Sequence, residues 1–375
     1  MGKLKSIYLD NAAATPLDPE VKKVFVEALG FYANPSALHE EGIHIRHLLE
    51  DARKKVASHL GAHSDEIIFT GSGTESNNLA IRGLVRDGHI VTTNIEHPSV
   101  LETCKEFDVT FVKVDSNGIV DPKKIEAAIK ENTVLVSVML ANNEIGTIEP
   151  IGEIAKVIRH YRKKNNTEYP YFHTDAVQAI NYLPVDVNKL GVDLITLNGS
   201  KIYGPKGVGV LYKKRGLALE SIMTGGGQEM EFRPGTENLL AILGFAKALE
   251  VVVRKREIER ERLKGLQNYF FEKIEEIKGV VINGDRASRL PNNVNISLPG
   301  YTSDILVIEL SARGIAVSSK SACKEGSDAS YVVAAIGGTG RDSIRFSLGR
   351  DTEKDDINYT IGALRDIMLK YKQYR

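Results

Sequence analysis

Short apolar runs alternate with helix-length segments over the first two thirds of the chain. The predicted strands between about residues 65 and 215 are 66–70, 89–93, 109–113, 133–138, 169–173, 193–197 and 207–212. Helices fit between most of them, for example at 121–130 and 151–164. Strands that alternate with helices in this way are typical of a largely parallel sheet covered on both faces. The pattern therefore predicts an α/β fold.

The pattern changes after residue 240. Residues 241–278 are helical in period and highly charged, and their mixed acids and bases favour a solvated helix crossing between domains over a nucleic-acid contact. Two short strands, a helix and a final helix follow at 280–283, 293–298, 303–313 and after a capping box predicted from Thr352 to Asp355. We predict a large domain of residues 15–255 and a smaller α+β domain of residues 1–14 and 256–375, which carries Cys323.

Composition narrows the class of protein. The 375 residues carry 49 basic and 49 acidic side chains, so the balanced charge predicts no general affinity for nucleic acid or for an acidic membrane. The chain has only two cysteines, Cys104 and Cys323, which argues against a disulfide framework and for a reducing compartment. Without a secretory signal or a spanning segment in the pattern, we expect a cytoplasmic protein. No metal site is visible in the sequence.

A lysine and an aspartate carry the strongest chemical signal. Lys201 follows the apolar run 192–197 and precedes a turn rich in glycine and proline, while Asp175 ends the run 171–175. Lysine is rarely buried without a partner or a task. An acid and a lysine at the ends of two strands of one sheet suit pyridoxal phosphate, because the lysine can hold the aldehyde and the acid can keep the pyridine nitrogen protonated.

Other polar motifs follow neighbouring strands. The glycine-rich turn at 70–78 opens a helix at Gly73 and Thr74, which suits a phosphate, although such turns are also common without a ligand. His97 precedes a proline and is either a polar cap or a ring that stacks on the pyridine and moves protons. Asn143 is either part of an ordinary turn or an amide for an oxygen or a carboxylate, and Gln178 is placed to reach the ring oxygen of the cofactor.

The second half of the chain adds a thiol and a guanidinium. Cys323 lies among small and polar residues between Lys320 and Lys324, a setting that lowers the pKa of an exposed thiol, although an incidental cysteine fits equally. Cys104, on a predicted helix, is expected to be inert. Arg345 has the planar fork that suits a substrate carboxylate.

Taken together, these motifs make the chain similar to the class V, fold-type I pyridoxal phosphate enzymes, and closely similar to the cysteine desulfurases of the NifS/IscS type. The resemblance runs almost from end to end. It rests on segments 8–16, 34–39, 69–76, 94–98, 137–146, 173–178, 201–207, 225–228, 233–238, 317–323 and 343–350.

The resemblance implies a role for each matched residue. Lys201 is the Schiff-base lysine, Asp175 pairs with the pyridine nitrogen, Gln178 with the ring oxygen, and His97 stacks on the ring. The phosphate ligands implied by it are Gly73, Thr74, Asn198, Ser200 and, from the partner subunit of a homodimer, Thr236. Arg345 and Asn143 hold the carboxylate of L-cysteine, and Cys323 takes the sulfur as a persulfide while alanine is released. The expected partners are protein sulfur acceptors, such as an iron–sulfur scaffold or a tRNA-thiolation enzyme.

The chain departs from the family pattern just before the lysine. The family has Ser-x-His there, whereas this chain has Asn198 and Ser200, which can still donate hydrogen bonds to a phosphate. The alternative functions within the same fold are selenocysteine lyase and another class V lyase or aminotransferase. The setting of Cys323 favours desulfuration, since transamination needs no thiol.

Overall fold

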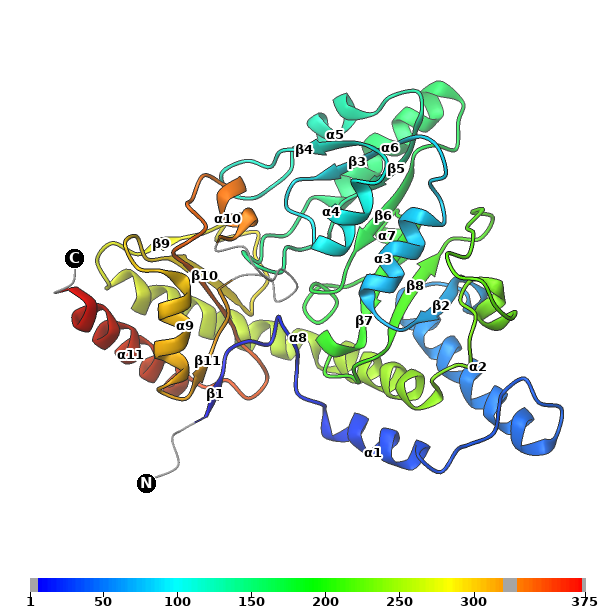
Figure 1. The fold of residues 1–375 in the computed structure, drawn as a ribbon, viewed down its shortest axis with the longest axis horizontal. Coiled ribbons are helices and arrows are strands. Elements are labelled where there is room, and N and C mark those ends of the chain that lie inside the picture. The colour runs from blue at the N-terminus through cyan, green and yellow to red at the C-terminus, as the bar shows by residue number, and fades with distance from the viewer. Residues whose placement is uncertain (1–5, 320–328, 373–375) are drawn as a thin grey trace.

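The central sheet of the molecule has seven strands in the order β2-β8-β7-β6-β5-β3-β4 (Figure 1). The computed structural model describes residues 6–319 and 329–372. The strands are β2 (Ile67–Thr70), β3 (His89–Thr93), β4 (Asp108–Val112), β5 (Thr133–Ser137), β6 (Tyr171–Asp175), β7 (Leu194–Asn198) and β8 (Gly209–Lys213). Only β8 runs antiparallel to its neighbours in this sheet, so the carboxyl ends of the other strands share one edge.

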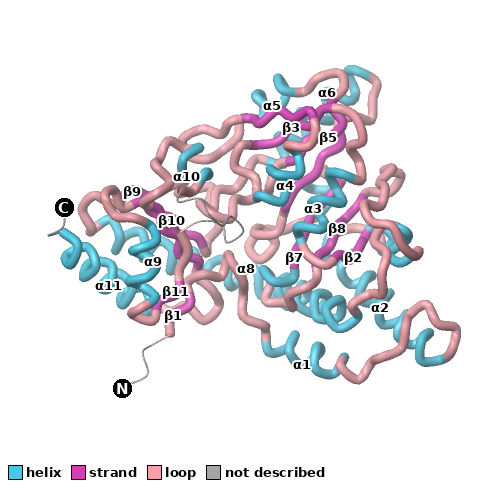
Figure 2. Tube along the Cα trace, in the orientation of Figure 1, coloured by secondary structure: helices cyan, strands magenta, loops and turns pink. Residues whose placement is uncertain are grey.

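Helices cover both faces of this sheet and extend beyond it (Figure 2). They are α1 (Pro19–Ala28), α2 (Glu40–Leu60), α3 (Gly73–Arg82), α4 (Pro98–Cys104), α5 (Pro122–Ala128), α6 (Ile151–Asn165), α7 (Val187–Leu190), α8 (Leu239–Glu275), α9 (Ser303–Ser311), α10 (Tyr331–Ala335) and α11 (Lys354–Lys372). Three short 3-10 turns lie at η1 (Ser64–Glu66), η2 (Gly199–Lys201) and η3 (Gln228–Glu231). Helix α8 contacts α1 and α2 on one side and β10 and α11 on the other, so it joins the two ends of the molecule.

Two smaller sheets lie at the far end of α8. Strand β10 (Asn293–Ser297) pairs antiparallel with both β12 (Ser343–Ser347) and β9 (Val281–Ile282). The N-terminal strand β1 (Ile7–Tyr8) pairs in parallel with β11 (Ile315–Ala316). The beginning of the chain is thereby attached to its last third.

The strands of the central sheet are apolar on both faces because both faces are covered. Along β2, Ile67 belongs to the cluster that includes α2, α6 and α8, and the next residue, Ile68, belongs to the cluster formed with α3 and α4. Strand β8 alternates in the same way at Leu211 and Tyr212. Side chains that alternate between two buried layers explain why the sequence shows continuous apolar runs rather than a polar face.

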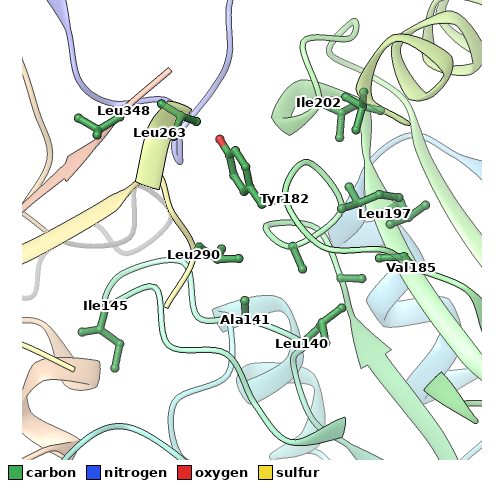
Figure 3. Close-up of a cluster of buried hydrophobic side chains, with 14 of the residues drawn as sticks. Leu140, Ala141, Ile145, Tyr182, Val185, Leu197, Ile202, Leu263, Leu290 and Leu348 are labelled. Carbon is green, nitrogen blue, oxygen red and sulfur yellow. The ribbon is translucent and has the colours of Figure 1, made fainter. Parts of the chain in front are cut away.

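The larger of the two clusters continues from the central sheet into the small sheets. Figure 3 shows side chains of the central layer, such as Leu140 and Leu197, in the same cluster as Leu263 of α8 and Leu348 after β12. Such a shared core means that the two ends of the molecule are packed together rather than merely linked. The domain division at residues 15–255 stays a prediction.

The α/β fold predicted from the sequence is confirmed, with most strands displaced by a residue or two at most. The direction of β8 is a new finding, since the alternation of strands and helices does not report it. The predicted capping box is wrong in register: the N–H of Glu353 donates to Asp356 Oδ2 at 2.9 Å, while Thr352 Oγ1 accepts from Gly349 instead. Across residues 6–319 and 329–372, no helix combines the length and apolar character needed to cross a membrane.

Candidate active site

A pocket of about 110 Å³ lies at the edge where the parallel strands end. Loops that follow β3, β5, β6 and β7 meet there with the start of α3, the N-terminal segment and β12. In open α/β sheets this edge is where ligands bind. The lining residues are Ala12, Ala13, Gly73, Thr74, Asn77, His97, Ser99, Met139, Ala141, Asn143, Asp175, Val177, Gln178, Asn198, Lys201 and Arg345.

Asp175 is the last residue of β6 and is 7% exposed. Its Oδ1 accepts the N–H of Val177 at 3.0 Å, and its Oδ2 accepts Nδ2 of Asn77 at 2.8 Å. Both donors are neutral, and the described residues show no ion pair between this carboxylate and an arginine, lysine or histidine. A buried carboxylate held in this way offers its negative charge to a cation from outside the chain.

His97 serves as the N-cap of α4 and also lines the pocket. Its Nδ1 accepts the N–H of Ser99 at 3.2 Å and lies 2.7 Å from Ser99 Oγ. Burial lowers the pKa of His97; the Asp175 carboxylate opposes that shift, and the Lys201 ammonium adds to it. The cap predicted for this histidine is confirmed, while stacking on a cofactor ring and proton transfer stay predictions.

Lys201 ends the 3-10 turn η2, which follows β7 directly. Its Nζ donates to the carbonyl of Ala13, and Gln178 Nε2 donates to the carbonyl of Ala12 at 3.0 Å. The hydroxyl of Thr15 donates to the carbonyl of Ser200 at 3.1 Å. The N-terminal segment is thus a wall of the pocket, connected by hydrogen bonds to the central sheet.

Arg345, in the middle of β12, is 2% exposed and is the largest fully buried side chain of the described residues. Its Nη2 pairs with Asp10 Oδ1 at 2.7 Å, and its Nη1 donates to the carbonyl of Asn143 at 2.9 Å. Two buried atoms here, Arg345 Nε and Asn143 Oδ1, have no hydrogen-bond partner among the described residues. The arrangement leaves both a donor and an acceptor for a small ligand.

The start of α3 forms the third side of the pocket. A Cβ added to Gly73 would lie 3.2 Å from Val177 Cγ2 and 3.3 Å from Asn198 Cβ, so only glycine fits without displacing these side chains. Gly73 and Thr74 lie at the positive end of the helix dipole, which favours an anion. Asn198 lies across from them in the same lining.

Two of the predicted residues that the structure describes are not part of this lining. Ser200 is half-buried, and its hydroxyl lies 3.3 Å from Asn198 Oδ1, while Thr236 is exposed outside the pocket. Cys323 lies outside the described residues. Cys104 is fully buried, and burial raises the pKa of its thiol, in agreement with the inert role expected for it.

The sequence interpretation missed several residues that the fold brings to the site. Asp10 pairs with Arg345 from a position 335 residues away, and Asn77 and Ser99 contact Asp175 and His97. Ser99 stands two residues after His97, a spacing that signals a helix cap and was available in the sequence. Asn77 gives no such signal, because only the packing of α3 against the sheet places it there.

Known proteins resemble this chain over nearly its whole length. Residues 7–360 match the family model described as aminotransferase class-V. A cysteine desulfurase IscS of Dictyoglomus turgidum is 43% identical over 98% of this chain and 96% of its own length. One from Methanosarcina thermophila is 39% identical over 98% and 93%.

Solved structures agree with the sequence comparison. A NifS-like protein superposes with a TM-score of 0.90 at 33% identity, covering 98% of this chain and all of its own. The protein SspA, solved in complex with cysteine, superposes with a TM-score of 0.77 at 33% identity, covering 92% of this chain and 99% of its own. The chain belongs to the class V aminotransferase family, and within that family to the cysteine desulfurases of the NifS/IscS type.

Proposed function

We propose that the protein uses pyridoxal phosphate to convert L-cysteine into L-alanine and transfers the released sulfur to Cys323. The observation that carries this proposal is that one pocket holds both Lys201 and the buried carboxylate of Asp175, whose hydrogen-bond donors among the described residues are the neutral Asn77 and Val177. When bound, the cofactor supplies an electron sink for cleavage at the substrate's carbon–sulfur bond. Asp175 supplies the negative charge that would keep its ring nitrogen protonated.

The other lining residues suit the remaining parts of such a cofactor and its substrate. Gly73, Thr74 and Asn198 would hold the phosphate, and Gln178 would reach the ring oxygen. His97, whose pKa is lowered by burial, is suited to stack on the ring in its neutral form. Lys201 would hold the aldehyde and move a proton at the substrate's α-carbon. For Ser200 we propose only an indirect role, through its contact with Asn198.

Arg345 and Asn143 would bind the carboxylate of the substrate. The Nε of Arg345 and the Oδ1 of Asn143 are both buried without a described partner. The free Nε would donate to the carboxylate, as would the NH₂ group of Asn143, whereas the Oδ1 of Asn143 would accept from a donor such as the substrate's ammonium group. An arginine is suited to this task because its fork matches a carboxylate.

Sulfur transfer balances without an external oxidant. The thiolate of Cys323 attacks the substrate sulfur, a new S–S bond forms, and the substrate's Cβ–S bond breaks with its electron pair remaining on carbon. Protonation of that carbon gives alanine, and Cys323 carries a persulfide. A thiol reductant would later release the outer sulfur as sulfide.

The decisive experiment compares the two cysteines of the chain. We expect wild type and Cys104→Ala to form alanine and sulfide from L-cysteine and a thiol reductant in equal amounts. Cys104 is the matched control because it is buried and outside the pocket lining. Cys323→Ala should form neither product while keeping the visible absorbance of the bound cofactor. If Cys323→Ala keeps its activity, Cys323 is not the sulfur carrier and another lyase or an aminotransferase is the better assignment.

The assembly and its partners belong to the same proposal. Exposure of Thr236 outside the pocket supports a homodimer in which the partner subunit's Thr236 completes the phosphate site. A monomer that binds cofactor fully would contradict this. Sulfur acceptors are expected to be proteins of iron–sulfur assembly or tRNA thiolation, and the cytoplasmic location stays a prediction.

A further inference from the structure

Four side chains from three segments, α3, β6 and the start of α4, form one continuous hydrogen-bonded chain in the lining of the pocket. Asn77 of α3 contacts Asp175 Oδ2 and Ser99 Oγ through the same nitrogen, Nδ2, at 2.8 Å each. Ser99 Oγ in turn lies 2.7 Å from Nδ1 of His97. Asn77 is 1% exposed and Ser99 is 9% exposed, so these bonds are largely shielded from bulk solvent.

The carboxylate at one end determines the direction of the first bonds. An ionised carboxylate only accepts hydrogen bonds, so Asn77 must present its NH₂ group to Asp175 rather than its oxygen. Its Oδ1 has no partner among the described residues, which excludes a competing reason for the opposite orientation. The second hydrogen of Nδ2 then points to Ser99, whose oxygen accepts it.

The donor and acceptor roles at Asn77 also determine which group donates to His97. Because Ser99 Oγ accepts from Asn77, its own hydrogen is available for His97 Nδ1 at 2.7 Å. The backbone N–H of Ser99 also donates to this nitrogen, at 3.2 Å. Two donors that converge on Nδ1 require a lone pair there, and in a neutral imidazole the hydrogen is then on Nε2.

We infer that Asn77 and Ser99 are positioning residues that fix His97 as the neutral tautomer with its hydrogen on Nε2. The same bonds fix the plane of the imidazole relative to Asp175, and therefore relative to any ring that Asp175 holds. Burial of His97, which lowers its pKa, favours the same neutral form. The importance of this geometry for catalysis rests on the proposed function of His97, but the tautomer itself does not.

A spectroscopic measurement tests the tautomer independently of activity. Holoenzyme labelled with ¹⁵N-histidine is observed by two-bond ¹H–¹⁵N correlation NMR at neutral pH, and the His97 signals are assigned from their loss in His97→Gln. We expect Nδ1 to show the shift of an unprotonated nitrogen and Nε2 that of a protonated one. A hydrogen on Nδ1, or a doubly protonated ring, would overturn the inference even if the enzyme is fully active as a desulfurase.

A pair of variants on α4 separates positioning from general stability. Ser99→Ala removes the hydroxyl donor, whereas Thr103→Val removes a buried hydroxyl one turn later that donates to the carbonyl of Ser99 at 2.9 Å. Ser99→Ala leaves the longer backbone N–H bond as the single donor to Nδ1, so we expect the preference for one tautomer to weaken and the second tautomer to become detectable. We expect a kcat about three- to tenfold lower, since one hydrogen bond is worth about 1 kcal/mol, with little change in KM. Thr103→Val should lower the unfolding midpoint but keep the wild-type tautomer and kcat.

Restoring the hydroxyl completes the test. Ser99→Thr keeps a donor at the same position and is expected to recover the single tautomer and most of kcat. The positioning role is overturned if Ser99→Ala retains the wild-type tautomer and kcat, or if Thr103→Val alters both to the same degree. If all these variants, like wild type, bind cofactor and form no alanine, the NMR signature still decides the inference, while the proposed function fails.

Discussion

Asp175 lines the pocket, and Asp10 pairs with Arg345, another residue of that lining; the fold treats the two negative charges in opposite ways. Asp10 pairs with the guanidinium of Arg345 at 2.7 Å, so two opposite charges of the chain neutralise each other. Asp175 has only neutral donors from Val177 and Asn77. The charge of Asp10 is balanced within the protein, whereas the charge of Asp175 can pair with a ligand. A carboxylate that is buried, hydrogen-bonded and without a cation is thus the stronger indication of a binding site.

Glu96 shows a third way in which the fold accommodates a buried carboxyl group. It is completely buried directly before His97, and its oxygens accept the N–H of Met139 at 3.0 Å and the hydroxyl of Thr93 at 2.7 Å. Burial raises its pKa to about 8, against the effect of these hydrogen bonds. Among the described residues no ion pair offsets the burial of Glu96, so its carboxyl group keeps its proton at neutral pH.

The largest effect is expected from the carboxylate that has no cation. Asp175→Asn removes the charge offered to the cofactor ring, and loss of one partner of a buried charge pair costs about 3–5 kcal/mol, so kcat/KM for L-cysteine should fall more than about a hundredfold. The measurement is alanine formation at saturating cofactor. Asp193→Asn is the control: Asp193 is 3% exposed, pairs with Arg162 at 2.5 Å and lies outside the pocket lining. Equal activity losses in both variants would remove the distinction between the two kinds of carboxylate.

A substitution of Arg345 tests the Asp10–Arg345 ion pair and the binding of the substrate carboxylate. In Arg345→Lys, one ammonium would have to replace a fork that contacts Asp10, Asn143 and the substrate, so KM for L-cysteine should rise about tenfold or more while kcat changes less. Steady-state kinetics separate the two constants. Arg350→Lys is the matched control, because Arg350 pairs with Asp18 at 2.6 Å away from the pocket lining. An unchanged KM in Arg345→Lys would show that the carboxylate binds elsewhere.

Glu96 predicts a pH dependence of folding stability. Its pKa is about 8 in the fold and near 4.5 in the unfolded chain, so the native state binds more protons between these values. Stability from this group is therefore complete below about pH 4.5 and decreases as the pH rises to about 8, by at most about 1.4 kcal/mol per pH unit. Glu96→Gln, which resembles the protonated form, should flatten this slope in urea unfolding measured from pH 5 to 8. A slope identical to that of wild type would mean that Glu96 is ionised in the fold.

The smallest effect is expected at Asp10. Asp10→Asn keeps an acceptor for Arg345 but removes the charge, so the free energy of unfolding should fall by about 1–2 kcal/mol in the cofactor-free protein. Urea unfolding of apoprotein measures this change. Ser347→Ala serves for comparison, since Ser347 Oγ accepts the N–H of Ala12 at 2.9 Å in the same segment without a charge. If Asp10→Asn is as stable as wild type, the ion pair with Arg345 contributes nothing to the apoprotein.

The sequence predicts those parts of the molecule that leave a recognisable pattern in neighbouring residues of the chain. Strands with both faces buried read as apolar runs, and the ends of such runs locate Asp175 and Lys201 at one edge of a parallel sheet. The direction of β8 has no local signal, because both of its faces are buried whichever way it runs. The same is true of the register of the last helix cap, where Asp356 is used instead of Asp355.

Residues whose partners are distant in the sequence could not be predicted from the sequence. Asp10 reads as an ordinary residue after a short strand until β1 is placed beside β11 and next to β12. Asn77 looks like any polar residue of a helix until α3 packs onto the sheet and points it at Asp175. Residue types alone identify groups that carry chemistry, whereas the groups that orient them are recognised only from contacts.

The wall formed by the N-terminal segment has a consequence for the order of events during protein synthesis. Asp10 can form its ion pair only after Arg345 has been synthesised. The amide of Asn11 likewise needs the carbonyl of Ser347, 336 residues later. Because the ribosome synthesises the chain from its N-terminus, almost the entire polypeptide must be made before the N-terminal segment can form this wall of the pocket. Contacts of such long sequence separation also form slowly. Nascent chains and fragments that end before β12 should consequently be unable to retain a cofactor, however well their central sheet has formed.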